Sequence, residues 1–379
     1  MDKSSLPALR HDRTPRFEWS QAEHLQLLID GAAFYPHLIE TLHKAQRRIW
    51  IELYLISSGS TYRSIALALT AACQRGVDVR LIIDGLGGQG LHDDDRLALQ
   101  AAGVQLRVYN PTRWRHPLRS LLRDHRKILI IDDQAYTGGA GISDDFAPLS
   151  RYPWRETMLF MQGPVVEQWS CLFLSLWPET PPTPTAPPPA AGGVRVRVNA
   201  SQADLPQHLQ ASLLRAIARS HRQVWLATPY FLPPRRLRKA LRLAARRGVD
   251  VRLLIPGRHN DHPFIAWLGQ SFLSLMGQDG VQVFEYHPRF LHTKVWLCDD
   301  WCSLGSSNMD RWGMFWNLEA NLEIDDAAFA ATVQAMLRED FAQAQQLKNS
   351  GKSVALSLLR LMLHRVIEQL ERWRRQHKP

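Results

Sequence analysis

Two short segments of this 379-residue chain carry the same reactive side chains at the same spacing. Both read His-x-Lys-x4-Asp, over residues 125–132 and 292–299. In each copy an apolar run separates the lysine from the aspartate, which is typical of a buried β-strand. Because residues i and i+2 of a strand point to the same side, we expect each His and Lys to face one way, with the Asp at the following turn. The six motif residues are His125, Lys127, Asp132, His292, Lys294 and Asp299.

Two imidazoles and two ammonium groups gathered in one cleft suit a phosphodiester substrate. One histidine can attack phosphorus and the other can donate a proton, while the two lysines hold the phosphoryl oxygens. A single His-x-Lys in a basic protein is more typical of a solvated strand edge. Here both motifs are followed by a turn of small residues, Gly138-Gly139 and Gly305-Ser306. The repeated pattern therefore favours a catalytic site.

Composition and charge restrict the class of partner and the compartment. The net charge of +10 favours an anionic partner, which could be nucleic acid, a phosphoinositide or an anionic bilayer. The polar start of the chain and the lack of any run of about 18 apolar residues argue against a signal peptide and a transmembrane helix. Four cysteines without CxxC spacing are typical of reduced core thiols in the cytosol. They are Cys73, Cys171, Cys298 and Cys302.

The elements that precede the first motif return before the second. Gly76-Val-Asp-Val-Arg80 recurs as Gly248-Val-Asp-Val-Arg252, and Gly103-Val-Gln105 recurs as Gly280-Val-Gln282. Strand-like and helix-like runs alternate in both parts. We therefore predict an α/β fold of two duplicated halves, each a mixed, mostly parallel sheet flanked by helices. Packing about a pseudo-two-fold axis would place the active site between the halves and supply both histidines.

Composition also divides the chain into segments. We expect a flexible N-terminal tail, a first half, a Pro-rich linker, a second half and a basic amphipathic C-terminal helix. In that order they cover residues 1–20, 21–177, 178–193, 194–348 and 349–379.

The motifs resemble those of the phospholipase D superfamily, whose hallmark is a pair of His-x-Lys-x4-Asp segments. Within it the chain is most similar to bacterial cardiolipin synthases of the short type, which lack amino-terminal membrane spans. Five further segments fit this resemblance. They are Asp124-His-Arg-Lys127, Trp154-Arg-Glu-Thr157, Thr228-Pro-Tyr-Phe-Leu-Pro233, Gly305-Ser-Ser-Asn-Met-Asp310 and Asn317-Leu-Glu-Ala-Asn321.

The resemblance implies roles for the reactive residues. One histidine would form a phosphohistidine, and the other would protonate the leaving alkoxide and then deprotonate the incoming alcohol. The lysines would stabilise the phosphoryl oxygens, with Ser306 and Asn308 adding hydrogen-bond donors. We expect no cofactor and no metal ion. Asp132 and Asp299 are expected to be structural, capping the turn or pairing with a neighbour, although such residues often count as catalytic.

The resemblance also implies an acid about thirty residues after each histidine, which would fix the imidazole tautomer. Glu156 follows His125 at this spacing and Glu319 follows His292. A further acid, Glu52, lies inside an apolar strand and is either a member of the site or part of a structural ion pair. The first copy has Gly141 where the family usually has Asn, so we expect the halves to be functionally unequal.

The implied function is that of a phosphatidyltransferase, in particular a cardiolipin synthase. The alternatives are a phospholipase D hydrolase and a phosphodiesterase or nuclease of the same superfamily. We expect phospholipid substrates, an anionic membrane surface as partner and no nucleic acid, with the oligomeric state left open. The protein would be peripheral, on the cytoplasmic side of the cell membrane. Three basic segments could dock there, around residues 113–119, 235–247 and 353–375, but the second could be a solvated helix face and the third could cover the core.

Overall fold

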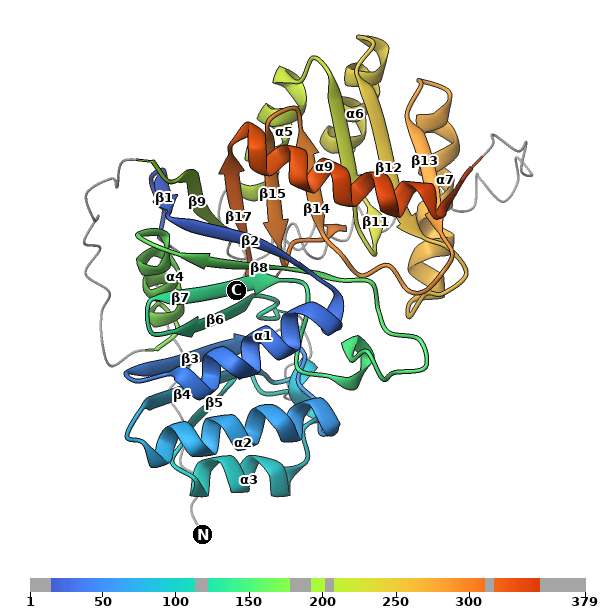
Figure 1. Ribbon diagram of the computed structural model, residues 1–379. Coiled ribbons are helices and arrows are strands. Elements are labelled where there is room, and N and C mark those ends of the chain that lie inside the picture. The colour runs from blue at the N-terminus through green and yellow to red at the C-terminus, as the bar shows by residue number, and fades with distance from the viewer. Residues whose placement is uncertain (1–14, 113–121, 178–191, 202–207, 311–316, 348–379) are drawn as a thin grey trace, which may run out of the picture.

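The first half contains a mixed sheet covered by helices (Figure 1). The structure is a computed structural model that describes residues 15–112, 122–177, 192–201, 208–310 and 317–347. The elements of this half are β2 (His24–Ile29), α1 (Asp30–Lys44), β3 (Arg48–Leu53), α2 (Ser60–Gln74), β4 (Asp78–Asp84), the 3-10 helix η1 (Gly87–Gly90), α3 (Asp93–Ala101), β5 (Gln105–Tyr109), β6 (Lys127–Ile131), β7 (Gln134–Gly138), the 3-10 helix η3 (Asp144–Phe146), β8 (Thr157–Gln162) and α4 (Val165–Leu174).

The second half repeats this plan. Its elements are β1 (Ser20–Ala22), β9 (Val194–Ser201), α5 (His208–Arg219), β10 (Gln223–Ala227), β11 (Phe231–Leu232), α6 (Arg235–Arg246), β12 (Asp250–Pro256), α7 (Pro263–Gly277), β13 (Gln282–Tyr286), β14 (Val295–Cys298), β15 (Trp301–Gly305), β16 (Met309–Asp310), β17 (Glu319–Asp325), α9 (Ala327–Ala342) and β18 (Ala344–Gln346). Of these strands, β11 and β16 pair with each other in a separate two-stranded sheet.

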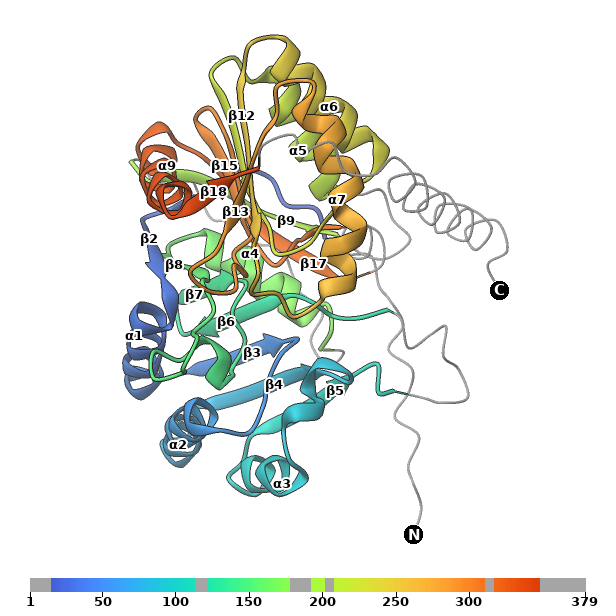
Figure 2. The ribbon, with the colours of Figure 1, turned by 90° about the vertical axis from the view of Figure 1, so that its right-hand side faces the viewer.

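Strand order confirms the duplication. The first sheet runs β2-β8-β7-β6-β3-β4-β5, and the second contains the same series as β9-β17-β15-β14-β10-β12-β13. The second sheet is extended at its edges by β18 and by β1, so the start of the described chain joins the sheet of the second half. Figure 2 shows α1, α2 and α3 outside one sheet and α5, α6 and α7 outside the other, on opposite sides of the molecule.

The mixed α/β architecture is confirmed, but the expectation of mostly parallel pairing was wrong. In the first sheet only the neighbours among β3, β4 and β5 are parallel, and the other described neighbours are antiparallel. The reason lies in the motif itself. Each motif strand is the first arm of a tight hairpin, β6–β7 or β14–β15, and a hairpin forces antiparallel pairing. The helical crossovers α2 and α3 connect strands that are direct neighbours, β3 to β4 and β4 to β5, and these neighbours pair in parallel.

An apolar core joins the two halves. It contains Trp169 and Leu172 of α4, Val196 of β9 and Leu337 of α9, all fully buried. Alternate residues of the motif strand β6 divide between two cores, because Ile128 and Ile130 enter this shared core whereas Leu129 and Ile131 pack under the outer helices. His125 and Lys127, which are two residues apart, follow the same alternation and lie on one side of the chain, as the sequence predicts.

Each motif aspartate closes the hairpin that follows its strand. Asp132 accepts backbone hydrogen bonds from Gln46, Arg47 and Arg48 at 2.8–3.0 Å, and its own φ is 51°. Asp299 has the same conformation, with φ 52°, and accepts from residues 221–223. Partial burial raises the pKa of both carboxyl groups, but these backbone donors outweigh it and the net pKa is lowered. The two aspartates are therefore structural, at the end of the strand opposite the histidine.

Several expectations concern residues that lie outside the described part of the chain. These are most of the tail, most of the Pro-rich linker, the basic segment 113–119 and the C-terminal helix. Within the described ranges, no helix is long and apolar enough to cross a membrane. In the same ranges, no group of three or more His, Cys, Asp or Glu side chains is placed to hold a metal ion.

The turn formed by Asp132 can be tested by its effect on stability. We expect Asp132→Ala to lower the free energy of unfolding by about 2–3 kcal/mol, because three backbone N–H groups lose a charged acceptor and alanine is strained at positive φ. The neighbouring Asp133→Ala is the control, since Asp133 is exposed and its ion-pair partner Arg47 is exposed as well. That change should stay within about 0.5 kcal/mol in denaturant unfolding. Equal stability of the two variants would contradict this structural role.

Candidate active site

The two histidines lie where the halves exchange backbone hydrogen bonds. The His125 N–H donates to the Leu318 carbonyl at 2.9 Å, and the His292 N–H donates to the Arg155 carbonyl at 2.8 Å. Reciprocal bonds run from Leu318 to Arg123 at 2.9 Å and from Arg155 to Phe290 at 2.8 Å. Each histidine, just before its motif strand, is thereby tied to the segment that leads into β17 or β8 of the opposite half.

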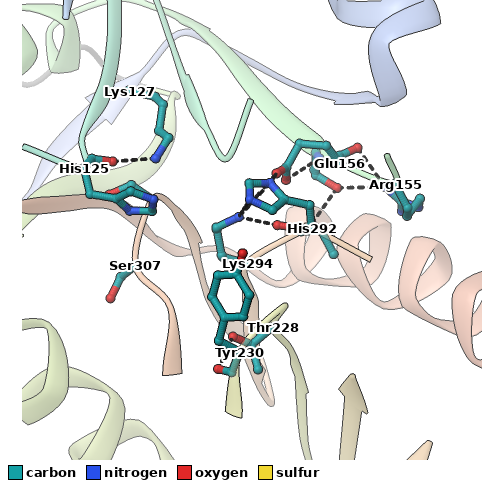
Figure 3. Close-up of polar contacts among 12 residues, drawn as sticks. His125, Lys127, Arg155, Glu156, Thr228, Tyr230, His292, Lys294 and Ser307 are labelled. Atoms are coloured by element: carbon teal, nitrogen blue, oxygen red, sulfur yellow. Dashed lines mark hydrogen bonds and ion pairs between the residues drawn. The ribbon is translucent and has the colours of Figure 1, made fainter. Parts of the chain in front are cut away.

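Each histidine forms a dyad with a glutamate of the other half, and Figure 3 shows the dyad of His292 with Glu156. His125 Nδ1 lies 3.0 Å from Glu319 Oε2, and His292 Nδ1 lies 2.5 Å from Glu156 Oε2. The two expected glutamates are thus the partners of the two histidines, but the expected pairing within each half was wrong. The pairs cross because backbone bridges, and not chain spacing, decide which glutamate lies beside which ring.

The motif lysines complete the site, each two residues after its histidine. The Lys127 ammonium donates to the His125 carbonyl at 2.6 Å. The Lys294 ammonium lies 3.4 Å from Glu156 Oε2 and 3.0 Å from His292 Nδ1, and it also donates to the His292 carbonyl. Both lysines and both glutamates are buried. The site therefore gathers two cationic and two acidic side chains around two imidazoles.

Burial governs the protonation of these groups. Burial raises the pKa of Glu319 to about 8, although the positive charge of Lys127 acts to lower it. Burial also lowers the pKa of Lys127 to about 7, although the negative charge of Glu319 acts to raise it. Burial and the lysine charges also lower the pKa of both histidines well below the ordinary value. Neutral imidazoles are therefore favoured at neutral pH, and a neutral imidazole has a free electron pair for attack.

Aromatic side chains enclose the imidazoles. The ring of His292 lies 5.0–5.7 Å, centroid to centroid, from Phe146, Trp154 and Phe290. The His125 ring has a single such neighbour among the described residues, Tyr54 at 4.9 Å. These rings limit rotation of the imidazoles and exclude water from them.

The expected phosphate donors behave differently from one another. The Ser306 hydroxyl donates to Glu319 Oε2 at 2.5 Å and accepts from the Ala320 N–H at 3.0 Å. It therefore holds the acid of one dyad and does not point to a substrate. Asn308 is buried and its amide oxygen has no hydrogen-bond partner in the described part of the chain. At Gly141 a Cβ would lie 2.2 Å from the Leu55 carbonyl oxygen, so the backbone excludes the asparagine found in the family.

Two buried ion-pair groups support the dyads. Arg126 Nε lies 2.6 Å from Glu52 Oε1 and 3.2 Å from Asp124 Oδ1, so Glu52 belongs to a structural ion pair. Behind Glu156, the Arg155 guanidinium makes a bidentate contact with Asp340 at 2.8 and 2.9 Å. Sequence analysis missed this second group, because Asp340 lies on α9, far from any motif. The position of Arg155 next to Glu156 was the available signal.

Comparison with known proteins agrees with this geometry. The family described as "Cardiolipin synthase, PLD-like domain" matches residues 38–177 and 213–341. The chain belongs to this cardiolipin synthase family. Cardiolipin synthase B of Salmonella typhimurium is 33% identical, over 84% of this chain and 81% of that protein. Cardiolipin synthase A of Pseudomonas entomophila is 32% identical, over 91% of this chain and 74% of that protein.

Solved structures share the fold of this cardiolipin synthase family member. Phosphatidylserine synthase of Haemophilus influenzae superposes with a TM-score of 0.72 at 14% identity, covering 92% of this chain and 94% of that one. Polyphosphate kinase of Porphyromonas gingivalis superposes with a TM-score of 0.61 at 14% identity, covering 92% of this chain and 54% of that one. At such identities the likeness concerns the fold.

The crossed pairing predicts which histidine responds to each glutamate. In Glu319→Gln, the ring-nitrogen NMR signals of His125 should shift, because Nδ1 of His125 loses the carboxyl partner that fixes its tautomer. The signals of His292 should stay in place. Glu156→Gln is the matched control and should reverse the pattern. A larger response of His292 than of His125 to Glu319→Gln would contradict the crossed arrangement.

Proposed function

We propose that this protein is a phosphatidyltransferase that synthesises cardiolipin through a phosphohistidine intermediate. The observation that carries the proposal is the pair of crossed His–Glu dyads, each with a buried lysine beside it. Membership of the cardiolipin synthase family supports the choice of a phospholipid as substrate. The six motif residues and the supporting Glu156 and Glu319 divide into reacting, charge-stabilising and positioning groups.

The reaction proceeds in two transfers that balance atoms and protons. One neutral imidazole attacks the phosphorus of donor phosphatidylglycerol. The opposite histidine, whose protonated form the negative charge of the bound phosphodiester favours, protonates the departing glycerol. That histidine, now neutral, takes the hydroxyl proton of an acceptor phosphatidylglycerol. The alkoxide attacks the phosphohistidine, which releases cardiolipin and restores the first imidazole.

The buried residues favour this chemistry through charge and position. Lys127 and Lys294 stabilise the negative charge that develops on the phosphoryl oxygens, in surroundings where burial strengthens electrostatic attraction. Glu156 and Glu319 hold the Nδ1 atoms, so that Nε2 of each ring is directed to the substrate. Ser306 positions Glu319, and Asn308 is retained as a candidate donor to the phosphate.

We place the enzyme at the cytoplasmic face of the membrane as a peripheral protein. The net charge of +10 favours an anionic leaflet, and the four cysteines are free, as in a reducing compartment. The decisive assay is incubation with labelled phosphatidylglycerol, with and without phosphatidylethanolamine, followed by lipid chromatography. Cardiolipin supports the proposal, phosphatidic acid indicates a hydrolase, and no lipid product favours a phosphodiesterase of another substrate class.

Both histidines should be indispensable for turnover. We expect His125→Ala and His292→Ala each to reduce cardiolipin formation by at least about 1,000-fold, because one change removes the nucleophile and the other the proton donor. His43→Ala, on the exposed end of α1, should retain activity. Circular dichroism should show that all three variants keep the fold. Substantial activity in either active-site variant would exclude the two-histidine mechanism.

Catalysis should not depend on a divalent ion. We expect activity to persist in EDTA, because Lys127 and Lys294 supply the positive charge that metal ions supply in other phosphoryl-transfer sites. The measurement is the rate of cardiolipin formation before and after chelation, with dialysed enzyme and lipid. Loss of activity on chelation and its recovery with one particular divalent ion would contradict the role given to the lysines.

A further inference from the structure

A loop of the first half lies beside His292. It covers residues 147–153 and connects Phe146 to Trp154. Both of these flanking rings contact the imidazole of His292, at centroid distances of 5.5 and 5.0 Å. The loop therefore begins and ends against one of the two reacting groups.

A segment of the second half lies near the same site. It covers residues 258–264, the last two of which begin α7. Within it, Asp261 accepts a hydrogen bond from the Tyr230 hydroxyl at 2.5 Å, and the ring of His262 lies 5.4 Å from that of Tyr230. Tyr230 is drawn next to Lys294 in Figure 3. Burial lowers the pKa of Lys294. The negative charge of Glu156 is the largest opposing effect, and the charge of Asp261 also acts to raise this pKa.

The two segments touch each other. The ring of Tyr152 stacks on that of His259 with centroids 5.7 Å apart and an interplanar angle of 27°. This contact joins the two segments into one continuous surface, which we call the rim and define as residues 147–153 and 258–264. The rim therefore spans both halves beside the dyad of His292 and Glu156.

Large apolar side chains of the rim are strongly exposed. Leu149 is 97% exposed, Phe264 65% and Tyr152 55%. Single exposed apolar residues are ordinary on a protein surface, whereas a group of them beside an active site marks a contact surface. The other strongly exposed apolar residues of the described chain lie at separate places, Ile29, Leu67, Leu86, Leu97 and Leu243.

The charges of the rim fit an anionic partner. Arg151 and Arg258 are exposed, and the Arg151 guanidinium lies 5.3 Å from the centre of the Tyr152 ring. Within the rim these two cations outnumber the single acid, Asp261, whose carboxylate accepts the hydrogen bond of the Tyr230 hydroxyl. Arginine, tyrosine and exposed aliphatic side chains together are typical of surfaces that lie in a bilayer interface.

The basic helix α6 is a weaker candidate for this contact than its sequence indicates. Arg246 pairs with Asp279 at 2.5 Å and Arg242 binds the same carboxylate. Arg247 donates to the carbonyls of Ile217 and Ser220. These three cations already have partners within the protein, and α6 carries a single strongly exposed large apolar side chain, Leu243, within the described chain.

We propose that the rim docks the enzyme on an anionic phospholipid bilayer. Leu149 and Phe264 enter the interfacial region, and Arg151 and Arg258 face the lipid phosphates. This inference rests on the proposed function, because it explains how phospholipids in a bilayer reach dyads that are buried between the halves. Docking through the rim turns the junction of the halves, and with it both imidazoles, toward the headgroups.

The test compares two double variants of matched exposure. Leu149→Ser with Phe264→Ser removes the apolar part of the rim, and Leu67→Ser with Leu97→Ser is the control, with residues 70% and 62% exposed on α2 and α3. The probe is sedimentation with vesicles of mixed phosphatidylglycerol and phosphatidylcholine. The rim variant should bind at least about tenfold more weakly than the parent protein, and the control should bind within about twofold of it.

A second measurement separates docking from catalysis. On short-chain phosphatidylglycerol below its micelle concentration, the rim variant should keep activity within about twofold, because neither residue contacts a dyad. Unchanged vesicle binding, or equal loss of activity on both substrates, would overturn the inference. So would a dimer of the parent protein in sedimentation velocity that the rim variant dissociates, since the rim would then bind a second copy. Absence of cardiolipin formation by the parent protein would refute the proposed function, while vesicle binding would still decide the role of the rim.

Discussion

The exchange of backbone hydrogen bonds between the halves is the constraint on which the rest of the site depends. His125 is bonded to the carbonyl of Leu318 and His292 to that of Arg155. The residue that follows Leu318 is Glu319, and the residue that follows Arg155 is Glu156. The same bridge that joins the halves therefore delivers the acid to the imidazole. Neither half can form a complete dyad alone, which gives the duplicated chain a physical reason to keep both copies.

Electrostatic compensation makes this arrangement tolerable inside a protein. An isolated buried ion costs several kcal/mol, whereas paired and hydrogen-bonded ions offset much of that cost. Lys127 and Glu319 have pKa values of about 7 and about 8, so that near neutral pH burial drives both toward their uncharged forms. An arriving phosphodiester changes the balance, because its negative charge favours protonated lysine. The site is thereby poised to become cationic when the substrate binds.

Much of this could be predicted from sequence, because the informative features are local. Strand parity placed each histidine and lysine on one face, repeated segments predicted the two halves, and a turn position explained Asp132. The pairing of glutamates was wrong, since spacing along a chain says nothing about bridges between halves. The hydrogen bond from Ser306 to Glu319 and the contact of Arg155 with Asp340 likewise depend on tertiary packing. The amount of antiparallel pairing was underestimated. An alternation of helices and strands suggests parallel strands joined by helical crossovers, but each motif strand is followed directly by a hairpin.

The repeat is symmetric in its backbone but not in its chemistry. The position that holds Ser306 in one half holds Gly139 in the other, where a Cβ would lie 2.1 Å from Glu156 Oε2. One glutamate is thus bonded by a hydroxyl and the other by the ammonium of Lys294. A reaction with an attacking imidazole and a protonating one needs two histidines that differ in basicity. Substitutions of single residues around a shared backbone give the two histidines unequal surroundings, which is what the proposed division of roles requires.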